Sequence, residues 1–379
     1  MRVAVGLSGG VDSSVAALLL KERGFDVVGL TMKLWRGTFA GGTRDACYGP
    51  GEAEDIERAA ALAESLGIEY RVVDCAEAYE KAIVAMFREI SLKGETPNPC
   101  VFCNAAMKFG LLPRLAREAG VEFDRFASGH YARIVRAGGR FAVRRAVDEK
   151  KDQSYFLCRL SQGQLSQVEF PLGGMTKREV RAIAAERSLS AADKADSQDF
   201  YSGDRNELIG EKPREGNIVD MAGRVLGRHC GYWNYTVGQR KGLGAFGPKP
   251  LYVVRLDACR NKVVLGTREE AHVAEFRVDN MNWMAAEPTR GRLSAFVKIR
   301  STGAPLGPVE FEDGLCRAPG EGLVGVAPGQ SAVFYDAEGT ILCGGVIRPR
   351  SPPSRRSGEM SRPTPGAKIT IVRANRFVV

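Results

Sequence analysis

The sequence predicts an α/β domain followed by an all-β region, and two observations carry this prediction. From Met1 to about Ser202, strand-like apolar runs alternate with helix-like stretches. Such alternation is typical of crossover units, which build a mainly parallel sheet covered by helices on both faces. From about Gly216 onward, short strand-like runs recur between Gly, Pro and Asp turns, a pattern typical of small β domains and barrels.

The individual elements follow in chain order. The apolar run RVAVGL leads through a Gly- and Ser-rich turn into SVAALLLKERG, which is predicted to be a helix. In the first region, strands are predicted at residues 2–7, 25–32, 69–74 and 125–134, with a further helix at residues 51–67. In the second region, strands are predicted at residues 251–256, 261–266, 292–300, 331–336 and 341–347.

Four parts are expected along the chain. Residues 1–204 are predicted to form a doubly wound parallel-sheet domain, residues 205–272 a small central β domain and residues 273–348 a C-terminal β-barrel. Pro, Ser and Arg dominate beyond Arg348, so residues 349–379 are expected to be a flexible tail.

Charge and hydropathy limit the classes of function. The 54 Lys and Arg against 45 Asp and Glu give a net charge of +9, which favours a polyanionic partner such as nucleic acid. The segment RPRSPPSRRSGEMSRP supplies part of that excess, so charge alone does not decide the partner. Without a charged and apolar leader or an apolar run of roughly 18 residues, the chain is expected to be cytoplasmic and to contact no membrane.

Nine cysteines in a chain without a leader argue against a disulfide scaffold. They favour thiol or metal chemistry in a reducing compartment. Most of the nine are expected to be buried packing residues, because a thiol behaves as a small apolar group.

The turn SGGVDSS, residues 8–14, has the layout of an anion site. Backbone N–H groups at the start of a helix attract anions, and glycines allow close approach. The turn contains no lysine to hold a transferring γ-phosphate, so it suits the pyrophosphate that leaves when ATP donates AMP. The carboxylate of Asp12 would repel a phosphate unless a cation lay between them, which suggests Mg²⁺.

A family resemblance can be stated on these residues. GLSGGVDSS resembles the pyrophosphate-loop signature of the ATP-pyrophosphatase superfamily. TPNPCVFCNAAMKFG, SGHYAR, KDQSYFL and YTVGQRKGLG, in this order, resemble the bacterial tRNA-specific 2-thiouridylases, which place sulfur on C2 of the wobble uridine (U34) of tRNA. The similarity runs from Val3 to about Ile347 and closes with APGQSAVFYD. It implies that the first domain is an ATP-pyrophosphatase domain.

The resemblance implies site residues and partners. The partners are tRNA, bound through its anticodon arm, and a sulfur-donor protein or sulfide. The implied ATP contacts are Gly6, Leu7, Ser8, Gly9, Gly10, Val11, Asp12, Ser13, Met32 and Gly129. The implied tRNA contacts are Asn98, Pro99, Cys100, His130, Lys151, Asp152, Gln153, Arg300, Ser301 and Gln330, the last three for the anticodon arm.

The implied chemistry needs ATP, Mg²⁺ and a thiol. Adenylation turns the C2 oxygen of uridine into a leaving group, and a sulfur nucleophile then displaces AMP. In the family the thiol lies in a PNP-x-x-x-C-N setting, which here falls on Cys103. Cys100 stands where many relatives carry Asp. The catalytic set is expected to be Cys103, Cys100 and Asp12.

The second cysteine of the family is missing. Relatives that carry persulfide sulfur have it in a segment DSxxxC, which here reads DSQDFYSG, with Tyr201 at that position. The protein has therefore lost activity, takes sulfur directly onto Cys103, or uses other cysteines. Cys100 and Cys103 form a C-x-x-C pair, which suits a redox dithiol or two ligands of a [4Fe–4S] cluster. We favour the cluster over a persulfide relay.

A third cluster ligand is needed for that hypothesis. Cys230 is preferred and Cys47 is the other choice, because both lie in loops near family-like segments. Cys158 is expected to be a packing residue, and Cys75, Cys259, Cys316 and Cys343 are assigned to structure. Two other functions stay open: an adenylating ligase, such as an argininosuccinate or GMP synthetase, and an inactive relative that binds tRNA without turning over ATP.

Overall fold

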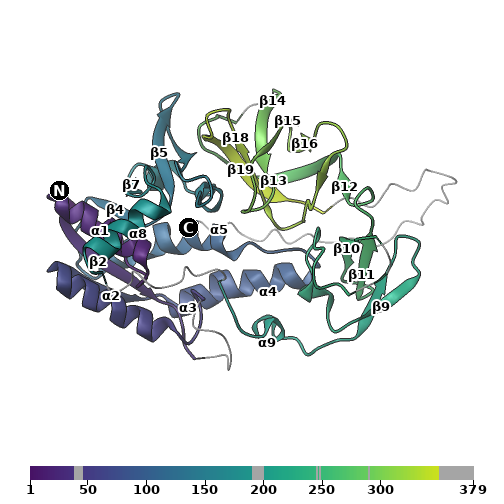
Figure 1. The fold of residues 1–379 in the computed structure, drawn as a ribbon, viewed down its shortest axis with the longest axis horizontal. Helices are drawn as coiled ribbons and strands as arrows, with labels where there is room; N and C mark the ends of the chain where they lie inside the picture. Colours follow the sequence, from purple (N-terminus) through teal and green to yellow (C-terminus); the bar gives the residue numbers. More distant parts are fainter. Residues whose placement is uncertain (38–45, 190–199, 245, 247–248, 289–290, 350–379) are drawn as a thin grey trace, which may run out of the picture. The chain divides into compact units, whose positions relative to one another are not determined.

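The computed structural model describes residues 1–349 apart from 38–45, 190–199, 245, 247–248 and 289–290 (Figure 1). The predicted tail therefore lies almost entirely outside the described residues. None of the helices in this described part has the length and apolar content to span a lipid bilayer.

A five-stranded parallel sheet forms the centre of the N-terminal domain. Its strand order is β3–β2–β1–β4–β7, so the chain reverses direction across the sheet beside β1. In such sheets ligands bind at the carboxyl ends of the strands on either side of the reversal. The strands are β1 (Arg2–Gly6), β2 (Asp26–Lys33), β3 (Glu69–Asp74), β4 (Arg125–Ser128) and β7 (Val168–Glu169).

Helices cover both faces of this sheet. Val3 and Val5 of β1 pack with Val15 of α1, whereas Ala4 packs on the other face with Leu112. Alternate side chains of a strand point to opposite faces, so both faces are buried. One face carries α1 (Val11–Glu22), α2 (Glu52–Leu66) and α8 (Lys177–Glu186), and the other carries α5 (Pro99–Cys103), η2 (Asn104–Leu111) and α6 (Leu112–Glu118). The predicted doubly wound domain is confirmed.

The predicted strand at residues 125–134 is in fact two strands. β4 ends at Ser128 because the backbone of Gly129 passes so close to α1 that a Cβ there would lie 2.6 Å from the Asp12 carbonyl carbon. The chain resumes as an antiparallel hairpin of β5 (Ala132–Ala137) and β6 (Arg140–Arg145). The domain also contains α3 (Ala76–Tyr79), η1 (Glu80–Val84), α4 (Ala85–Leu92), η3 (Ser154–Leu157) and α7 (Gln162–Leu165). A short helix, α9 (Arg205–Ile209), follows it along the chain.

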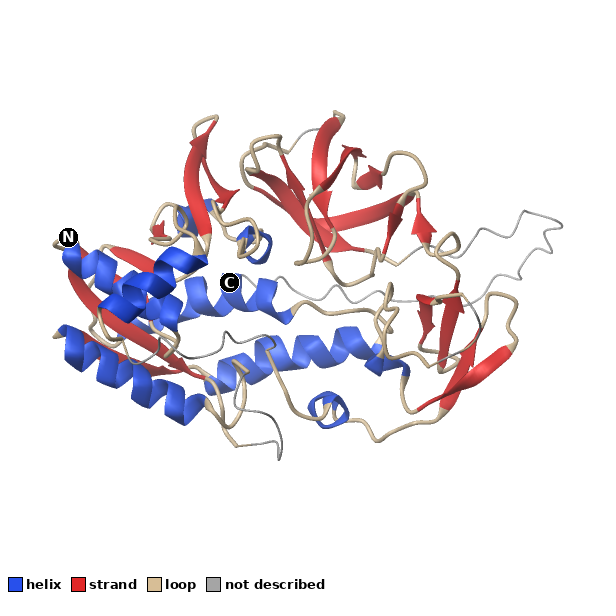
Figure 2. Cartoon of the chain, viewed as in Figure 1, coloured by secondary structure: helices blue, strands red, loops and turns tan. Residues whose placement is uncertain are grey.

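The remaining described chain is built almost entirely of strands (Figure 2). A central sheet has the order β10–β11–β8–β9, and a closed barrel has the order β13–β16–β15–β14–β18–β19. The central elements are β8 (Gly216–Val219), β9 (Val225–His229), η4 (Tyr232–Asn234), β10 (Tyr252–Asp257) and β11 (Lys262–Gly266). The barrel region has β12 (His272–Val273), β13 (Glu275–Trp283), β14 (Leu293–Lys298), β15 (Leu306–Glu312), β16 (Leu315–Arg317), β17 (Leu323–Val324), β18 (Ser331–Tyr335) and β19 (Ile341–Ile347).

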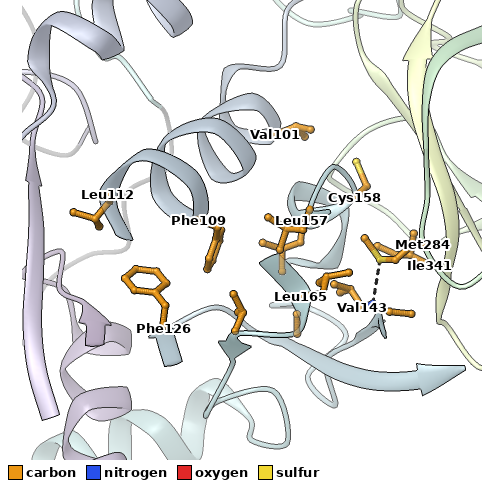
Figure 3. Close-up of a cluster of buried hydrophobic side chains, with 14 of the residues drawn as sticks. Val101, Phe109, Leu112, Phe126, Val143, Leu157, Cys158, Leu165, Met284 and Ile341 are labelled. Carbon is orange, nitrogen blue, oxygen red and sulfur yellow. Dashed lines mark hydrogen bonds between the residues drawn. The ribbon is translucent and has the colours of Figure 1, made fainter. Parts of the chain in front are cut away.

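One hydrophobic cluster joins the α/β domain to side chains of the barrel region (Figure 3). Met284 and Ile341 pack with Val143, Leu157 and Cys158, and the backbone N–H of Val143 donates a hydrogen bond to the Met284 sulfur at 3.1 Å. Cys158 is fully buried, which confirms its predicted packing role. The same buried region supports the loop between α4 and α5, described below.

Candidate active site

The turn between β1 and α1 is shaped for close approach to an anion. Gly9 has φ +66°, and a Cβ there would lie 2.5 Å from the carbonyl oxygen of Asp55, so only glycine fits. Gly10 is the N-cap of α1 and has no side chain to cap the first turn. The first N–H groups of a helix have no intrahelical partner, so they are available to a phosphate. The Ser13 hydroxyl accepts from the N–H of Ser8 at 3.2 Å and holds the turn closed.

A lysine does reach this turn, from a distant helix. The Nζ of Lys177 lies 2.8 Å from both carboxylate oxygens of Asp12, and the Tyr131 hydroxyl donates to the same carboxylate at 2.8 Å. Lys177 opens α8, and its side chain is only 9% exposed. The ammonium group compensates the charge of Asp12, which removes much of the expected repulsion of a phosphate.

Sequence reasoning missed Lys177, although part of its signal is local. The Thr176 hydroxyl and the Glu179 carboxylate form a capping box, which marks the start of α8 at Lys177. Nothing local indicates that this first residue meets Asp12, which lies 165 positions earlier.

A cavity of about 250 Å³ opens at the carboxyl ends of β1, β2 and β4. Val11 packs in the helix–sheet core at 2% exposure, so its side chain has a structural role. Thr31 and Lys108 are wall residues that the sequence analysis did not identify. The predicted ATP residues on the wall are Gly6, Leu7, Ser8, Asp12, Ser13, Met32 and Gly129.

His130 belongs to the wall of this cavity and is only 8% exposed. Its Nδ1 lies 2.8 Å from the Ser128 hydroxyl, and burial holds the pKa of the imidazole well below its usual value. The ring is therefore neutral. The structure places His130 on the wall of this cavity, and the tRNA contact that the resemblance implied for it stays a prediction.

The predicted triplet Lys151, Asp152 and Gln153 separates into three environments. Lys151 is exposed, and Gln153 lines the cavity and accepts from the N–H of Tyr131 at 2.9 Å. The side chain of Asp152 is 1% exposed and lies 3.6 Å from the Nζ of Lys298, itself 4% exposed. Asp152 is therefore part of a buried ion pair, and of the three only Lys151 has the exposure that a tRNA contact needs.

The loop before α5 is held by a glutamine of the barrel. The Nε2 of Gln330 donates to the carbonyl of Pro97 at 3.1 Å, and its Oε1 accepts from the Asn98 amide at 3.2 Å. Asn98 is 7% exposed and caps α5 by accepting from the N–H of Val101. Pro99 follows at the first helical position, where a missing N–H costs nothing. Gln330, Asn98 and Pro99 thus position the loop, and their contact with tRNA stays a prediction.

Cys100 and Cys103 lie one turn apart on α5 and therefore share a face. Both are half-buried, and burial raises the pKa of the Cys103 thiol to about 11 while Lys108 opposes that rise. All nine cysteines fall within the described chain and are reduced thiols.

The predicted set of three cluster ligands is not assembled. The part of the chain that the structure describes contains no group of three His, Cys, Asp or Glu side chains able to hold a metal ion. Cys230 follows β9 in the central sheet, where it is exposed and its carbonyl accepts from the N–H of Arg214 at 3.1 Å. The structure gives no contact of Cys230 with Cys100 or Cys103 among the described residues, so its assignment as a third ligand stays a prediction.

The remaining predicted residues lie on other surfaces. Arg300 is exposed and Ser301 is half-buried, just after β14. Cys259 is exposed and so is not a core residue, whereas the other cysteines assigned to structure, Cys75, Cys316 and Cys343, are buried. The contact of Arg300 and Ser301 with an anticodon arm stays a prediction.

Three family descriptions match successive parts of the chain. Residues 1–201 match a tRNA methyl transferase HUP domain and residues 206–267 a tRNA methyl transferase PRC-barrel domain. Residues 273–347 match an aminomethyltransferase beta-barrel domain. The three matches correspond to the parallel-sheet domain, the central sheet and the closed barrel.

Curated relatives match nearly the whole chain. The tRNA-specific 2-thiouridylase MnmA of Endomicrobium trichonymphae is 43% identical over 357 residues, covering 92% of this chain and 99% of the relative. The protein of that name from Methylobacterium radiotolerans is 43% identical over 367 residues, covering 92% and 93%. That from Gloeothece citriformis is 44% identical over 358 residues, covering 91% and 99%. The similarity extends through the α/β domain, the central sheet and the barrel.

Proposed function

Because this chain belongs to the family of tRNA-specific 2-thiouridylases, we propose that it uses ATP to place sulfur on C2 of the wobble uridine of tRNA. One observation carries the proposal: the helical run that begins with the two thiols of α5 continues to Lys108, on the wall of the cavity. A nucleotide site and a thiol site thus share one rigid element. That is the arrangement needed when a base is first adenylated and then attacked by sulfur.

The residues of the cavity have separate roles in adenylation. The first N–H groups of α1 and the ammonium of Lys177 bind the pyrophosphate end of ATP. The C2 oxygen attacks the α-phosphorus, and pyrophosphate leaves toward these donors. A bound Mg²⁺ would neutralise phosphate charge, and Asp12 and Asp55 present carboxylates of the kind that it prefers.

The sulfur step uses thiols directly, with Cys103 as one of the reacting groups. An iron–sulfur cluster would need three cysteine ligands, and the described residues contain no group of three side chains placed to hold a metal ion. We therefore derive no step from a cluster. The exposed Lys151 and Arg300 are the candidates for contacts with tRNA phosphates.

The family descriptions speak of methyl transfer, and Tyr201 at the family's cysteine position favours an inactive relative. Both alternatives make distinct predictions. A methyl transferase would release no AMP, and an inactive relative would bind tRNA without consuming ATP.

A thiolation assay with the full chain tests these functions. An unmodified tRNA transcript, ATP and a persulfide donor are incubated with the protein, and 2-thiouridine and AMP are quantified by mass spectrometry. We expect both products, in equal amounts and only with tRNA present. Asp12→Ala should abolish AMP formation and leave tRNA affinity near wild type. Tight tRNA binding without AMP from the wild-type protein would contradict the proposal.

A further inference from the structure

Cys47 lies beside the position of the missing cysteine. The N–H of the next residue, Tyr48, donates to the carbonyl of Phe200 at 2.9 Å, so the two chain segments run side by side. The rings of Tyr48 and Tyr201 are 6.4 Å apart. A thiol at position 47 is therefore next to the segment where persulfide-carrying relatives place theirs.

Cys47 and Cys103 also border the same group of side chains. Tyr48 and Tyr79 are buried in one cluster, against which Cys103 and Tyr201 pack. Burial, followed by the nearby Cys103, Cys47 and Cys100 thiols, holds the pKa of Tyr79 well above its usual value. Cys47 also lies near Cys103, because burial and then Cys47 raise the pKa of the Cys103 thiol. Tyr79 thus packs beside Cys103 and lies within electrostatic reach of Cys47.

The surroundings of the two thiols differ in a useful way. Cys47 is exposed and lines the cavity together with Asp12 and Ser13. Cys103 is half-buried against Tyr48 and Tyr79. An exposed thiol is accessible to a sulfur-donor protein, and its place on the cavity wall puts it beside the proposed ATP site. A half-buried thiol is less accessible to the donor, which suits the role of a resolving thiol.

Resting on the proposed function, we propose that Cys47 takes the role of the cysteine that Tyr201 replaces and carries the transferred sulfur, with Cys103 as the resolving thiol. The Cys47 thiolate attacks the outer sulfur of a protein persulfide, the donor leaves as a thiolate, and a persulfide remains on Cys47. Its terminal sulfur attacks C2 of the adenylated uridine, and AMP leaves with the electron pair of the C2–O bond.

The second thiol completes the transfer. Cys103 loses its proton to solvent and attacks the Sγ of Cys47. The bond between that Sγ and the sulfur on C2 breaks, and its electron pair stays on the sulfur of 2-thiouridine. The protein is left with a Cys47–Cys103 disulfide, which an external dithiol reduces with two electrons before the next turnover.

A single-turnover experiment without reductant tests the assignment. The full chain is loaded with a persulfide donor, mixed with tRNA and ATP, and alkylated; disulfides are then mapped by mass spectrometry, and AMP is measured in parallel. We expect a Cys47–Cys103 disulfide in the wild type. Cys47→Ser should lose at least 100-fold in 2-thiouridine formation, whereas the equally exposed Cys259→Ser should not. A wild-type rate in Cys47→Ser, or a Cys100–Cys103 disulfide in the wild type, would overturn the proposal.

Restoring the family cysteine supplies a second, independent readout. In the double variant Cys47→Ser with Tyr201→Cys, thiolation should recover at least tenfold relative to Cys47→Ser alone, because the new thiol enters the same cluster. A purely structural role of Cys47 gives no such rescue, and an absent rescue counts against the proposal. AMP formation distinguishes failure of this inference from failure of the proposed function. If AMP forms at the same rate with and without Cys47, only this inference is refuted. If the wild type forms no tRNA-dependent AMP, the proposed function is refuted.

Discussion

The turn at residues 7–10 and the loop at residues 96–98 both lead into a helix, but they are held in different ways. The turn is closed by neighbours in sequence, such as Ser8 and Ser13. The loop is held by Gln330, 232 positions beyond Asn98. Polar residues of a locally closed turn remain available to a ligand, whereas polar residues with distant partners serve as supports. Asp12 belongs to both groups, because Lys177 holds it from afar.

The largest expected effect tests that double role of Asp12. Lys177→Met should lower tRNA-dependent AMP formation by roughly 10³-fold, because an unpaired carboxylate would then face the phosphates. Arg178→Met, at the exposed next position of α8, is the matched control. The measurement is AMP release at saturating ATP. Activity in Lys177→Met within threefold of the control would show that the ion pair serves stability alone.

The second-largest expected effect is a loss of stability when the buried ion pair of Asp152 with Lys298 is broken. Asp152→Asn leaves Lys298 buried without its carboxylate, so we expect a loss of about 3 kcal/mol in the free energy of unfolding. Urea denaturation measures this loss. Glu149→Gln removes an ion pair to Arg145 in which the Glu149 side chain is 77% exposed, and it should cost under about 0.5 kcal/mol. If Asp152→Asn leaves stability unchanged but alters tRNA affinity, Asp152 contacts tRNA and is not a structural support.

The loop itself should respond more moderately. Gln330→Ala removes the bonds to Pro97 and Asn98, so we expect a loss of about 2 kcal/mol in stability and a lower kcat for thiolation. The KM for ATP should stay constant, because the nucleotide cavity lies elsewhere. Steady-state kinetics compared with the exposed Gln167→Ala separates the two effects. A raised KM for ATP with unchanged kcat would place Gln330 in nucleotide binding.

His130 predicts a smaller effect that depends on pH. Its folded-state pKa is depressed by burial, so below about pH 6.5 the unfolded chain binds a proton that the folded chain does not. The contribution of His130 to stability is thus present above that pH and falls as the pH drops. Between pH 7.5 and 5.5 we expect the wild type to lose about 1 kcal/mol through this group, a loss absent in His130→Gln. Equal losses in both proteins would assign the dependence to other groups.

The smallest expected effect concerns Lys151, the exposed residue of the triplet Lys151, Asp152 and Gln153. Lys151→Ala should weaken tRNA binding less than tenfold and lower the salt dependence of log K by about one unit of slope. Fluorescence titrations across a series of salt concentrations measure that slope. The neighbouring exposed Lys150→Ala is the control. Identical slopes in Lys151→Ala and wild type would remove Lys151 from the phosphate contacts.

Local pattern explains what could be predicted here. The alternation of strands and helices, and the change to an all-β region, are visible in the spacing of apolar residues along the chain. The fold class could therefore be predicted, and the structure confirmed it. The break between β4 and β5 was missed because it depends on the approach of Gly129 to α1, which is a tertiary contact. The anion-binding turn was identifiable because its glycines and serines are consecutive.

Distant contacts explain what was missed. In the sequence, nothing distinguishes Lys177 from an ordinary first residue of a helix. Its role depends on the packing of α8 beside α1, which is a tertiary contact. Sequence polarity alone does not separate the buried Asp152 from the exposed Lys151. Cys47 lines the cavity whereas Cys230 follows β9 of the central sheet, and these different places depend on tertiary contacts that local sequence does not show.

Protein synthesis delivers the loop at residues 96–98 long before the side chain that holds it. Domains fold from the N-terminus as the chain emerges, so the parallel sheet and its nucleotide cavity can form first. Gln330 leaves the ribosome only when the barrel is nearly complete, and until then Asn98 and Pro97 lack their partner. An unfinished or truncated chain therefore has the cavity of the α/β domain but lacks the glutamine that holds the loop before Cys100 and Cys103, so the placement of these thiols depends on completion of the barrel.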